Sequence, residues 1–125
     1  MKAVYATGTN YDDPLSVLEV GTMPEPETKP FWSTIRVNSA SVNHHDVWSL
    51  QGVGLSDEQT PMILGTDAAG VLEEDIPVRK GLKAGSEVVL YTFVGTDGAG
   101  VMPGERRSIL SERYAGTMAE FTQVP

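Results

Sequence analysis

Cysteine is absent from the 125 residues of this sequence. Its absence excludes disulfide bonds, thiolate ligands for a metal and a thiol nucleophile. Long apolar runs are missing too, because no stretch approaches the ~20 residues that a helix needs to span a bilayer. The alternating start over 1–6 is shorter than the apolar core of a signal peptide. We therefore expect a globular cytoplasmic protein that does not interact with membranes.

Basic residues are few, since 9 lysines and arginines stand against 17 aspartates and glutamates, for a formal net charge of −8. The longest basic cluster is the pair Arg106 and Arg107. Because an acidic surface repels phosphate groups, we expect no binding of nucleic acid or of anionic lipid.

Glycine and proline, by contrast, are abundant, with 13 and 8 residues. This composition, with Val-, Ile-, Tyr- and Phe-rich runs between turn residues, is typical of a single mostly-β domain. We predict strands over 2–6, 15–20, 34–42, 68–72, 86–94 and 116–124. Closely spaced prolines predict an extended connector over 23–30, and glycines predict a long loop over 95–111. We also predict a short helix that is capped by Asn43 or Asp46 and ends before Gly52.

A glycine-rich stretch over 98–104 (GAGVMPG) loosely resembles the fingerprint that binds dinucleotides. The helix that should receive the pyrophosphate would begin near Pro103, and it has no apolar stripe. Only about 20 residues follow, whereas the complete motif needs roughly 30 residues and a second parallel strand. A loop is therefore the favoured interpretation.

The adjacent histidines His44 and His45 are the only histidines of the chain. Neighbouring residues on a helix point about 100° apart, so they seldom bind the same metal ion, although Asp67 could complete a site. We favour one exposed histidine and one that is partly buried and hydrogen-bonded. A histidine that takes part in chemistry here would act as a hydrogen-bond donor or a proton relay.

Asp67 lies among small residues, in the segment 65–70 (GTDAAG). Small side chains let something approach the backbone closely, either a neighbouring strand or a ligand, and both alternatives stay open. The favoured role of the aromatic residues Phe31, Trp32 and Trp48 is as anchors at the core or its rim. The acidic runs over 57–58 and 73–75 are expected to be solvated surface.

Four segments in consecutive order resemble motifs of the medium-chain dehydrogenase/reductase superfamily. The first two are 41–52 (SVNHHDVWSLQG), similar to VNxxDxxxxxG, and 61–71 (PMILGTDAAGV), similar to PxxxGxDxxGxV. The others are 81–89 (GLKAGSEVV), similar to FKxGDxV, and 116–121 (GTMAEF), similar to GTFAEY. The start MKAV is also usual there, so the resemblance covers nearly the whole chain.

The resemblance implies a mostly-β, GroES-like, partly open β-barrel with one or two short helices over residues 1–125. Such a domain forms the substrate side of a quinone-oxidoreductase-like or alcohol-dehydrogenase-like enzyme. The family's dinucleotide-binding domain would follow Pro125, and we expect the chain without it to be inactive. An exposed strand edge would then favour a homodimer. The alternative is a stand-alone GroES-like module that binds a ligand or partner without catalysis.

The resemblance also bears on metals. In zinc-dependent relatives the position of Asn43 is a cysteine ligand, that of Thr66 is a histidine and that of Asp67 is a glutamate. An amide and a hydroxyl are poor replacements for a thiolate and an imidazole. The four-cysteine lobe that holds a second zinc ion in such relatives would fall within 95–113, where no cysteine occurs. We therefore expect no metal, with Asp67 as a supporting carboxylate.

For zinc-free relatives the resemblance implies that NADPH or NADH gives a hydride to a quinone or to an activated C=C or C=O bond. The oxyanion that develops must then be stabilised by hydrogen bonds and protonated. Asn43, His45 and Thr66 are the implied catalytic groups, and Asn43 and Thr66 would also face the nicotinamide ring. Asp46 would fix the loop, and Trp48 would line the substrate side.

Overall fold

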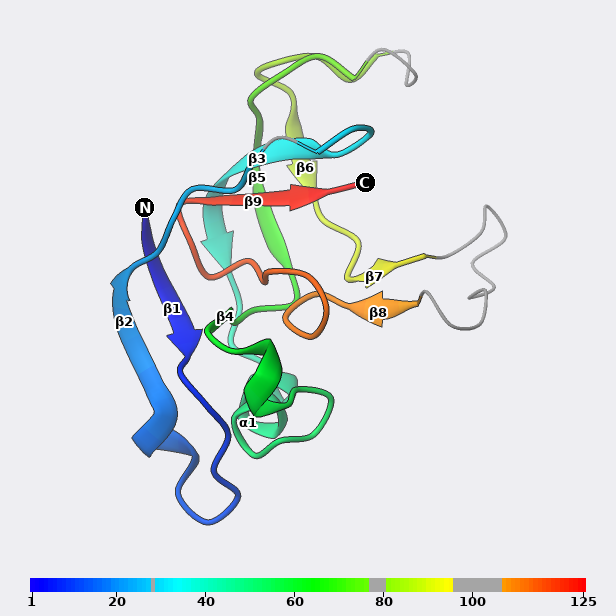
Figure 1. Ribbon diagram of the computed structural model, residues 1–125. Helices are drawn as coiled ribbons and strands as arrows, with labels where there is room; N and C mark the ends of the chain where they lie inside the picture. Colours follow the sequence, from blue (N-terminus) through cyan, green and yellow to red (C-terminus); the bar gives the residue numbers. More distant parts are fainter. Residues whose placement is uncertain (28, 77–80, 96–106) are drawn as a thin grey trace.

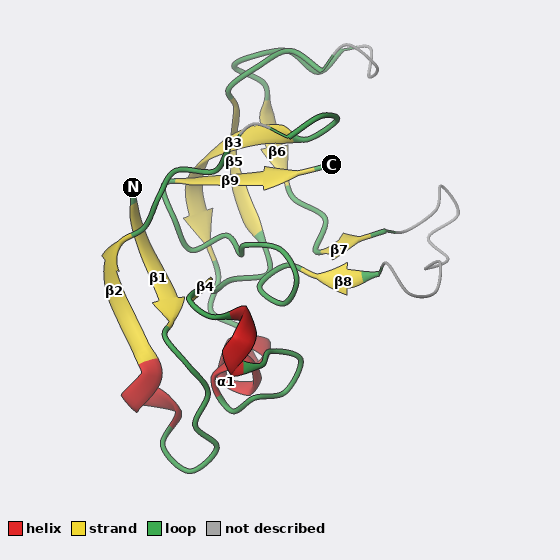
Figure 2. Cartoon of the chain, in the orientation of Figure 1, coloured by secondary structure: helices red, strands yellow, loops and turns green. Residues whose placement is uncertain are grey.

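The computed structural model describes residues 1–27, 29–76, 81–95 and 107–125. In this part of the chain strands dominate, with one α-helix and two 3₁₀ helices, Pro14–Val17 and Asp57–Gln59 (Figure 2). The strands are β1 (Lys2–Ala6), β2 (Leu18–Thr22), β3 (Ser33–Ala40), β4 (Met62–Ile63), β5 (Ala68–Leu72), β6 (Glu87–Val89), β7 (Phe93–Val94), β8 (Ser108–Ile109) and β9 (Phe121–Val124), and the helix is α1 (His44–Leu50). The expected mostly-β fold is confirmed.

The strands form three antiparallel sheets, ordered β2-β1-β4, β6-β5-β3-β9 and β7-β8. The four-stranded sheet lies at the top of Figure 1, β1 and β2 lie on the left, β7 and β8 on the right, and α1 below them. Strand β3 is central, because Ile35 pairs with Leu72 of β5 on one side and with Thr122 of β9 on the other. Its register shifts between Val37 and Ser39, next to the end that leads into α1.

Two clusters of buried apolar side chains stabilise this arrangement. The first joins α1 to β1 and β4 and consists of Ala6, Leu50, Leu55, Met62 and Leu64. The second lies on the four-stranded sheet and consists of Ile35, Ala68, Leu72 and Leu90. Because Leu50 belongs to the first cluster, apolar burial fixes α1 against the end of β4.

Glycines allow the backbone to pack closely on both sides of Asp67. A Cβ atom on Gly70 would overlap the carbonyl oxygen of Arg36 in β3 and lie 2.9 Å from Ile35 Cγ2. A Cβ atom on Gly65 would lie 2.5 Å from Thr117 Oγ1, and Gly65 has a φ of +96°. The small residues around Asp67 therefore serve strand packing, which is one of the two roles considered for them.

Two predicted strands are wrong in part. Instead of a strand over 15–20, a 3₁₀ helix begins at Pro14 and β2 starts only at Leu18. The ring of Pro14 fixes φ, and Ser16 donates both its N–H and its hydroxyl to the Asp13 carbonyl, which closes a turn. The predicted strand over 86–94 is two short strands, because β6 pairs with β5 whereas β7 pairs with β8.

The C-terminal part also differs from the prediction. Strand β8 lies inside the loop predicted over 95–111, whose central part, with the glycine-rich stretch 98–104, lies outside the described residues. Of the strand predicted over 116–124, only β9 forms a ladder. The preceding residues bond across the molecule instead: Gly116 donates to Ile63, Met118 donates to Leu64, and Val4 donates to Met118.

One predicted anchor is wrong, whereas Asp57 and Glu73 of the predicted surface runs are exposed as expected and also form contacts. Phe31 is 91% exposed, so it is not an anchor, whereas the Trp32 ring lies 5.0 Å from that of Tyr114. Asp57 accepts hydrogen bonds from the backbone and the hydroxyl of Thr9. Glu73, although exposed, forms an ion pair with Arg36 at 2.9 Å. No helix in the described residues is long and apolar enough to cross a membrane.

The substitution Gly70→Ala should destabilise the domain by about 1–3 kcal/mol, because the new methyl group meets rigid backbone of β3. Urea unfolding followed by circular dichroism measures the effect. Gly8→Ala is the matched control: its Cβ would meet its nearest atom at 3.5 Å, and its effect should stay below about 1 kcal/mol. Equal effects of the two substitutions would contradict close packing at Gly70.

Candidate functional site

The site begins where β3 ends and α1 begins. Asn43 has extended backbone angles, φ −120° and ψ 160°, and is the N-cap residue of α1. Its backbone N–H donates to Asp46 Oδ2 at 2.7 Å, three residues further along the chain. Such a contact satisfies a backbone group at the start of the helix, and the Asp46 carboxylate also suits the positive end of the helix dipole.

Asp46 also reaches beyond its own helix. Its carboxylate is 4% exposed, and Oδ1 accepts a hydrogen bond from the backbone N–H of Gly65 at 2.9 Å. One buried carboxylate therefore holds the start of α1 and the turn before β5 at a fixed separation. That turn carries Thr66 and Asp67, so Asp46 determines how these side chains meet Asn43.

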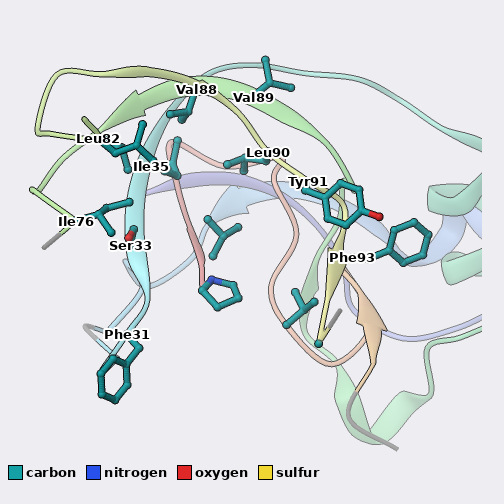
Figure 3. Close-up of a pocket in the computed structure, with 15 residues that line it drawn as sticks. Phe31, Ser33, Ile35, Ile76, Leu82, Val88, Val89, Leu90, Tyr91 and Phe93 are labelled. Atoms are coloured by element: carbon teal, nitrogen blue, oxygen red, sulfur yellow. The ribbon is translucent and has the colours of Figure 1, made fainter. Parts of the chain in front are cut away.

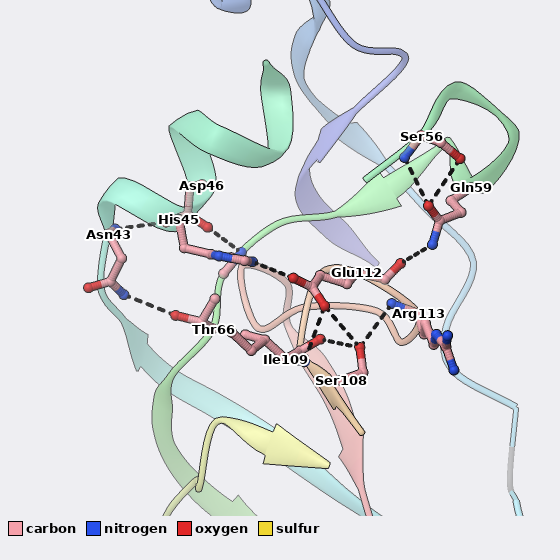
Figure 4. Close-up of polar contacts among 11 residues, drawn as sticks. Asn43, His45, Asp46, Ser56, Gln59, Thr66, Ser108, Ile109, Glu112 and Arg113 are labelled. Carbon is pink, nitrogen blue, oxygen red and sulfur yellow. Dashed lines mark hydrogen bonds and ion pairs between the residues drawn. The ribbon is translucent and has the colours of Figure 1, made fainter. Parts of the chain in front are cut away.

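The side chains of Asn43, Thr66 and Asp67 form a connected polar cluster. Asn43 Nδ2 donates to Thr66 Oγ1 at 3.2 Å and to Asp67 Oδ2 at 3.3 Å. Asp67 Oδ1 accepts from the backbone N–H of Ser41 at 3.0 Å. Thr66 is buried, whereas the carbonyl oxygen of the Asn43 side chain points away from the cluster (Figure 4).

Thr117 is a member of this site that we did not single out from the sequence. It is fully buried, and its hydroxyl donates to the Asp67 carbonyl at 2.6 Å. The segment 116–121 resembles a superfamily motif and was the signal in the sequence, but we assigned no role to its threonine. Thr117 joins the turn at Asp67 to the segment before β9.

His45 lies on the same turn of α1, but its ring points toward Glu112 (Figure 4). Nε2 of His45 is 3.7 Å from Glu112 Oε1, and the His45 side chain is 16% exposed. The other histidine, His44, is exposed, as expected for one of the pair. The partly buried histidine is His45, as expected for the other member of the pair, and its Nε2 has no hydrogen-bond partner within the described residues.

Trp48 stands apart from the polar cluster. It is 49% exposed, and its ring centroid lies 6.1 Å from that of His44. Within the described residues, no hydrogen bond or ring contact joins Trp48 to Asn43, Thr66 or Asp67. The structure therefore brings together Asn43, Asp46, Thr66 and Asp67. His45 lies in the first turn of α1 but its ring lies near Glu112, and Trp48 lies on the exposed side of the helix.

The groups with a shifted pKa and the apolar cavity described next lie outside this cluster. The pKa of Tyr5 is raised because its hydroxyl donates to Glu19, and the pKa of Glu58 is lowered by a hydrogen bond from Ser56. An apolar cavity of about 580 Å³ lies on the four-stranded sheet, where Ile35, Leu72 and Leu90 form part of its wall (Figure 3). None of the predicted site residues lines it.

Metal ligands are sparse at this site. Over the described ranges of the chain, no three His, Cys, Asp or Glu side chains lie close enough together to hold a metal ion. The polar cluster contributes a single carboxylate, Asp67, beside an amide and a hydroxyl, and these groups already bond to one another. The residues present do not fit a zinc ion.

Comparison with known proteins identifies the family. Residues 29–125 match the family described as the alcohol dehydrogenase GroES-like domain. The chain belongs to this family. The expected GroES-like fold is thereby confirmed, and the four motifs in the chain are those of a domain found in medium-chain dehydrogenases.

Similar proteins are dehydrogenases of greater length. An NAD-dependent alcohol dehydrogenase of known structure is 34% identical, with a TM-score of 0.80, over 100% of this chain and 37% of its own. A cobalt- and zinc-bound thermostable alcohol dehydrogenase from Pyrobaculum aerophilum is 27% identical, with a TM-score of 0.77, over 100% of this chain and 39% of its own. Dehydrogenase orsE of Emericella nidulans is 31% identical over 116 residues, 83% of this chain and 33% of that protein. The GroES-like chain thus spans between 33% and 39% of the length of these relatives.

The substitution Asp46→Asn should destabilise the GroES-like domain by about 1–3 kcal/mol, because the new amide places an N–H₂ group against a buried backbone donor. Urea unfolding measures the loss. Asp12→Asn, at an exposed position, is the control and should change stability by less than about 0.5 kcal/mol. An Asp46→Asn protein as stable as the native one would show that this carboxylate does not join α1 to the Gly65 turn.

Proposed function

We propose that this chain is the substrate-side part of a zinc-independent, NAD(P)H-dependent oxidoreductase that reduces quinones or activated C=C and C=O bonds. The observation that carries the proposal is the polar cluster of Asn43, Thr66 and Asp67. These residues occupy the positions that hold zinc ligands in the zinc-dependent enzymes that the sequence resembles. Here the same positions hold groups whose hydrogen bonds satisfy one another.

The proposal follows from what each group can offer a ligand. Both N–H bonds of the Asn43 amide are engaged, whereas its Oδ1 points outward (Figure 4). This oxygen is an acceptor suited to the amide N–H₂ of a nicotinamide ring. Thr66, which is buried beneath it, fixes the orientation of the Asn43 side chain.

A reduced nicotinamide, when bound, supplies the hydride. Without a metal, the negative charge that develops on the substrate oxygen needs a hydrogen-bond donor and a proton. His45 is the side chain beside Asn43 that can give both, since an imidazolium ring donates from two nitrogens. We assign to His45 the role of general acid, and to Asn43 the role of holding the nicotinamide.

A metal analysis tests the zinc-independent part. The chain, purified without a histidine tag and dialysed against zinc, should retain no stoichiometric zinc by elemental mass spectrometry. The double variant Asn43→Cys with Thr66→His should gain it, because a thiolate and an imidazole then join the Asp67 carboxylate. Stoichiometric zinc in the native chain would refute the proposal.

Kinetics test the catalytic part in the complete enzyme that contains this segment. NADPH oxidation with a quinone or an unsaturated ketone should persist after treatment with a chelator. His45→Gln should lower kcat by about 10²-fold or more, the usual contribution of a general acid. His44→Gln, on the neighbouring exposed residue, is the matched control and should leave kcat within a small factor. Equal effects of the two substitutions would remove His45 from the mechanism.

A further inference from the structure

The carboxylate of Glu112 is anchored through one oxygen and leaves the other free. Oε2 lies 3.3 Å from Ser108 Oγ, whose hydroxyl also reaches the Ile109 carbonyl at 2.9 Å, and it accepts from the backbone N–H of Ile109 at 3.4 Å. Oε1 faces Nε2 of His45 at 3.7 Å (Figure 4). The two contacts to β8 therefore orient the carboxylate so that its second oxygen is directed at the histidine.

Two further segments hold Glu112 in place. Its backbone carbonyl accepts a hydrogen bond from Gln59 Nε2 at 2.9 Å. Gly54, with a φ of +79°, passes so close that a Cβ atom there would lie 2.5 Å from Glu112 Oε1. A side chain at position 54 would displace the carboxylate, so the loop after α1 leaves just enough room for it. The loop over 54–59 and the segment over 108–112, which are distant in sequence, thus meet at Glu112.

His45 needs a hydrogen-bond acceptor on the Nε2 side of its ring. Its Nε2 is buried and has no hydrogen-bond partner within the described residues. Buried polar atoms rarely stay unpaired, and hydrogen bonds at catalytic sites are often long before a ligand binds. The neighbouring carboxylate of Asp46 is already engaged with Asn43 and Gly65. Glu112 Oε1 is therefore the acceptor placed to take the Nε2 proton.

We propose that Glu112 is the positioning residue of His45: its carboxylate keeps a proton on Nε2, so that Nδ1 is the nitrogen that exchanges protons with the ligand. The hydrogen bond of one ring nitrogen determines which form the other nitrogen takes. This inference rests on the function proposed above, in which His45 is the general acid. No sequence motif quoted above assigns a role to Glu112.

The proton transfer balances without any further reactant. In the protonated ring, Nε2–H faces Glu112 and Nδ1–H faces the substrate oxygen. The Nδ1–H bond breaks, an O–H bond forms, and His45 becomes neutral with its remaining proton on Nε2. Glu112 stays ionised throughout, and it offsets the positive charge of the ring before the transfer. Water then returns a proton to Nδ1.

Long-range proton–nitrogen NMR spectra of the histidine rings test the pairing in the chain itself, without cofactor or turnover. At a pH where both histidines are neutral, His45 should show an N–H signal at Nε2 and a bare-nitrogen signal at Nδ1. The exposed His44 provides an internal reference, because its two tautomers exchange and give averaged signals. Averaged signals for His45 in the native chain would overturn the inference by themselves.

Variants separate positioning from mere packing. Glu112→Gln should move the two His45 signals toward the averaged values, since an amide can accept from or donate to Nε2. Glu112→Asp keeps a carboxylate and should retain the single tautomer. Glu120→Gln is the matched control, because that carboxylate accepts from the backbone of Lys2 and should leave His45 unchanged. Unchanged His45 signals in Glu112→Gln would overturn the inference.

The inference and the proposed function fail in different ways. If the Glu112 variants change the His45 tautomer but His45→Gln leaves kcat unaltered in the complete enzyme, the pairing stands and the assigned acid is wrong. If Glu112 is the positioning residue of an acting His45, Glu112→Gln should lower kcat while KM changes little, and Glu112→Asp should restore most of it. An unaltered kcat in Glu112→Gln, together with a loss in His45→Gln, would remove Glu112 from the mechanism.

Discussion

The arrangement of the candidate site depends on the two hydrogen bonds of one buried carboxylate. Asp46 binds the backbone of Asn43 with one oxygen and the backbone of Gly65 with the other. The start of α1 and the turn before β5 come from distant parts of the chain. They are held together because the charged carboxylate of Asp46 accepts from two neutral backbone N–H groups. Such bonds are stronger than those between neutral groups, and in a buried place they leave little freedom. Asn43, Thr66 and Asp67 meet because of this constraint.

The same scaffold can serve two chemistries. In this chain the Asn43 amide donates to Thr66 and Asp67, so hydrogen bonds connect the three side chains directly. One similar alcohol dehydrogenase has cobalt and zinc bound, and another is NAD-dependent. A fold does not determine its chemistry, and the side chains at a few fixed positions do. In the present domain the side chains at these positions are Asn43, Thr66 and Asp67.

Local sequence patterns predicted those elements whose bounds do not depend on which strand they pair with. Alternation gave β1 and β5 with their observed bounds, and the capping residue and Gly52 placed α1 correctly. Prediction failed where partner choice decides: the apolar run that contains β6 and β7 is divided because each half pairs with a different strand. Asn43, Thr66 and Asp67 could be grouped from their motifs. Glu112 and Thr117 could not, because their contacts to His45 and Asp67 join segments that no periodicity links.

The central position of β3 has a consequence for how the polypeptide acquires its shape. Strand β9 pairs with β3 from far along the sequence, and Gln123 donates to the Thr34 hydroxyl across 89 positions. Closing so large a loop costs conformational entropy, and only the hydrogen bonds and contacts of the completed ladder offset that cost. Folds with many contacts between residues distant in sequence therefore fold slowly. During synthesis on the ribosome, the side of β3 that pairs with β9 stays unpaired until residues 121–124 emerge. A chaperone or a transient strand would shelter that side in the interval.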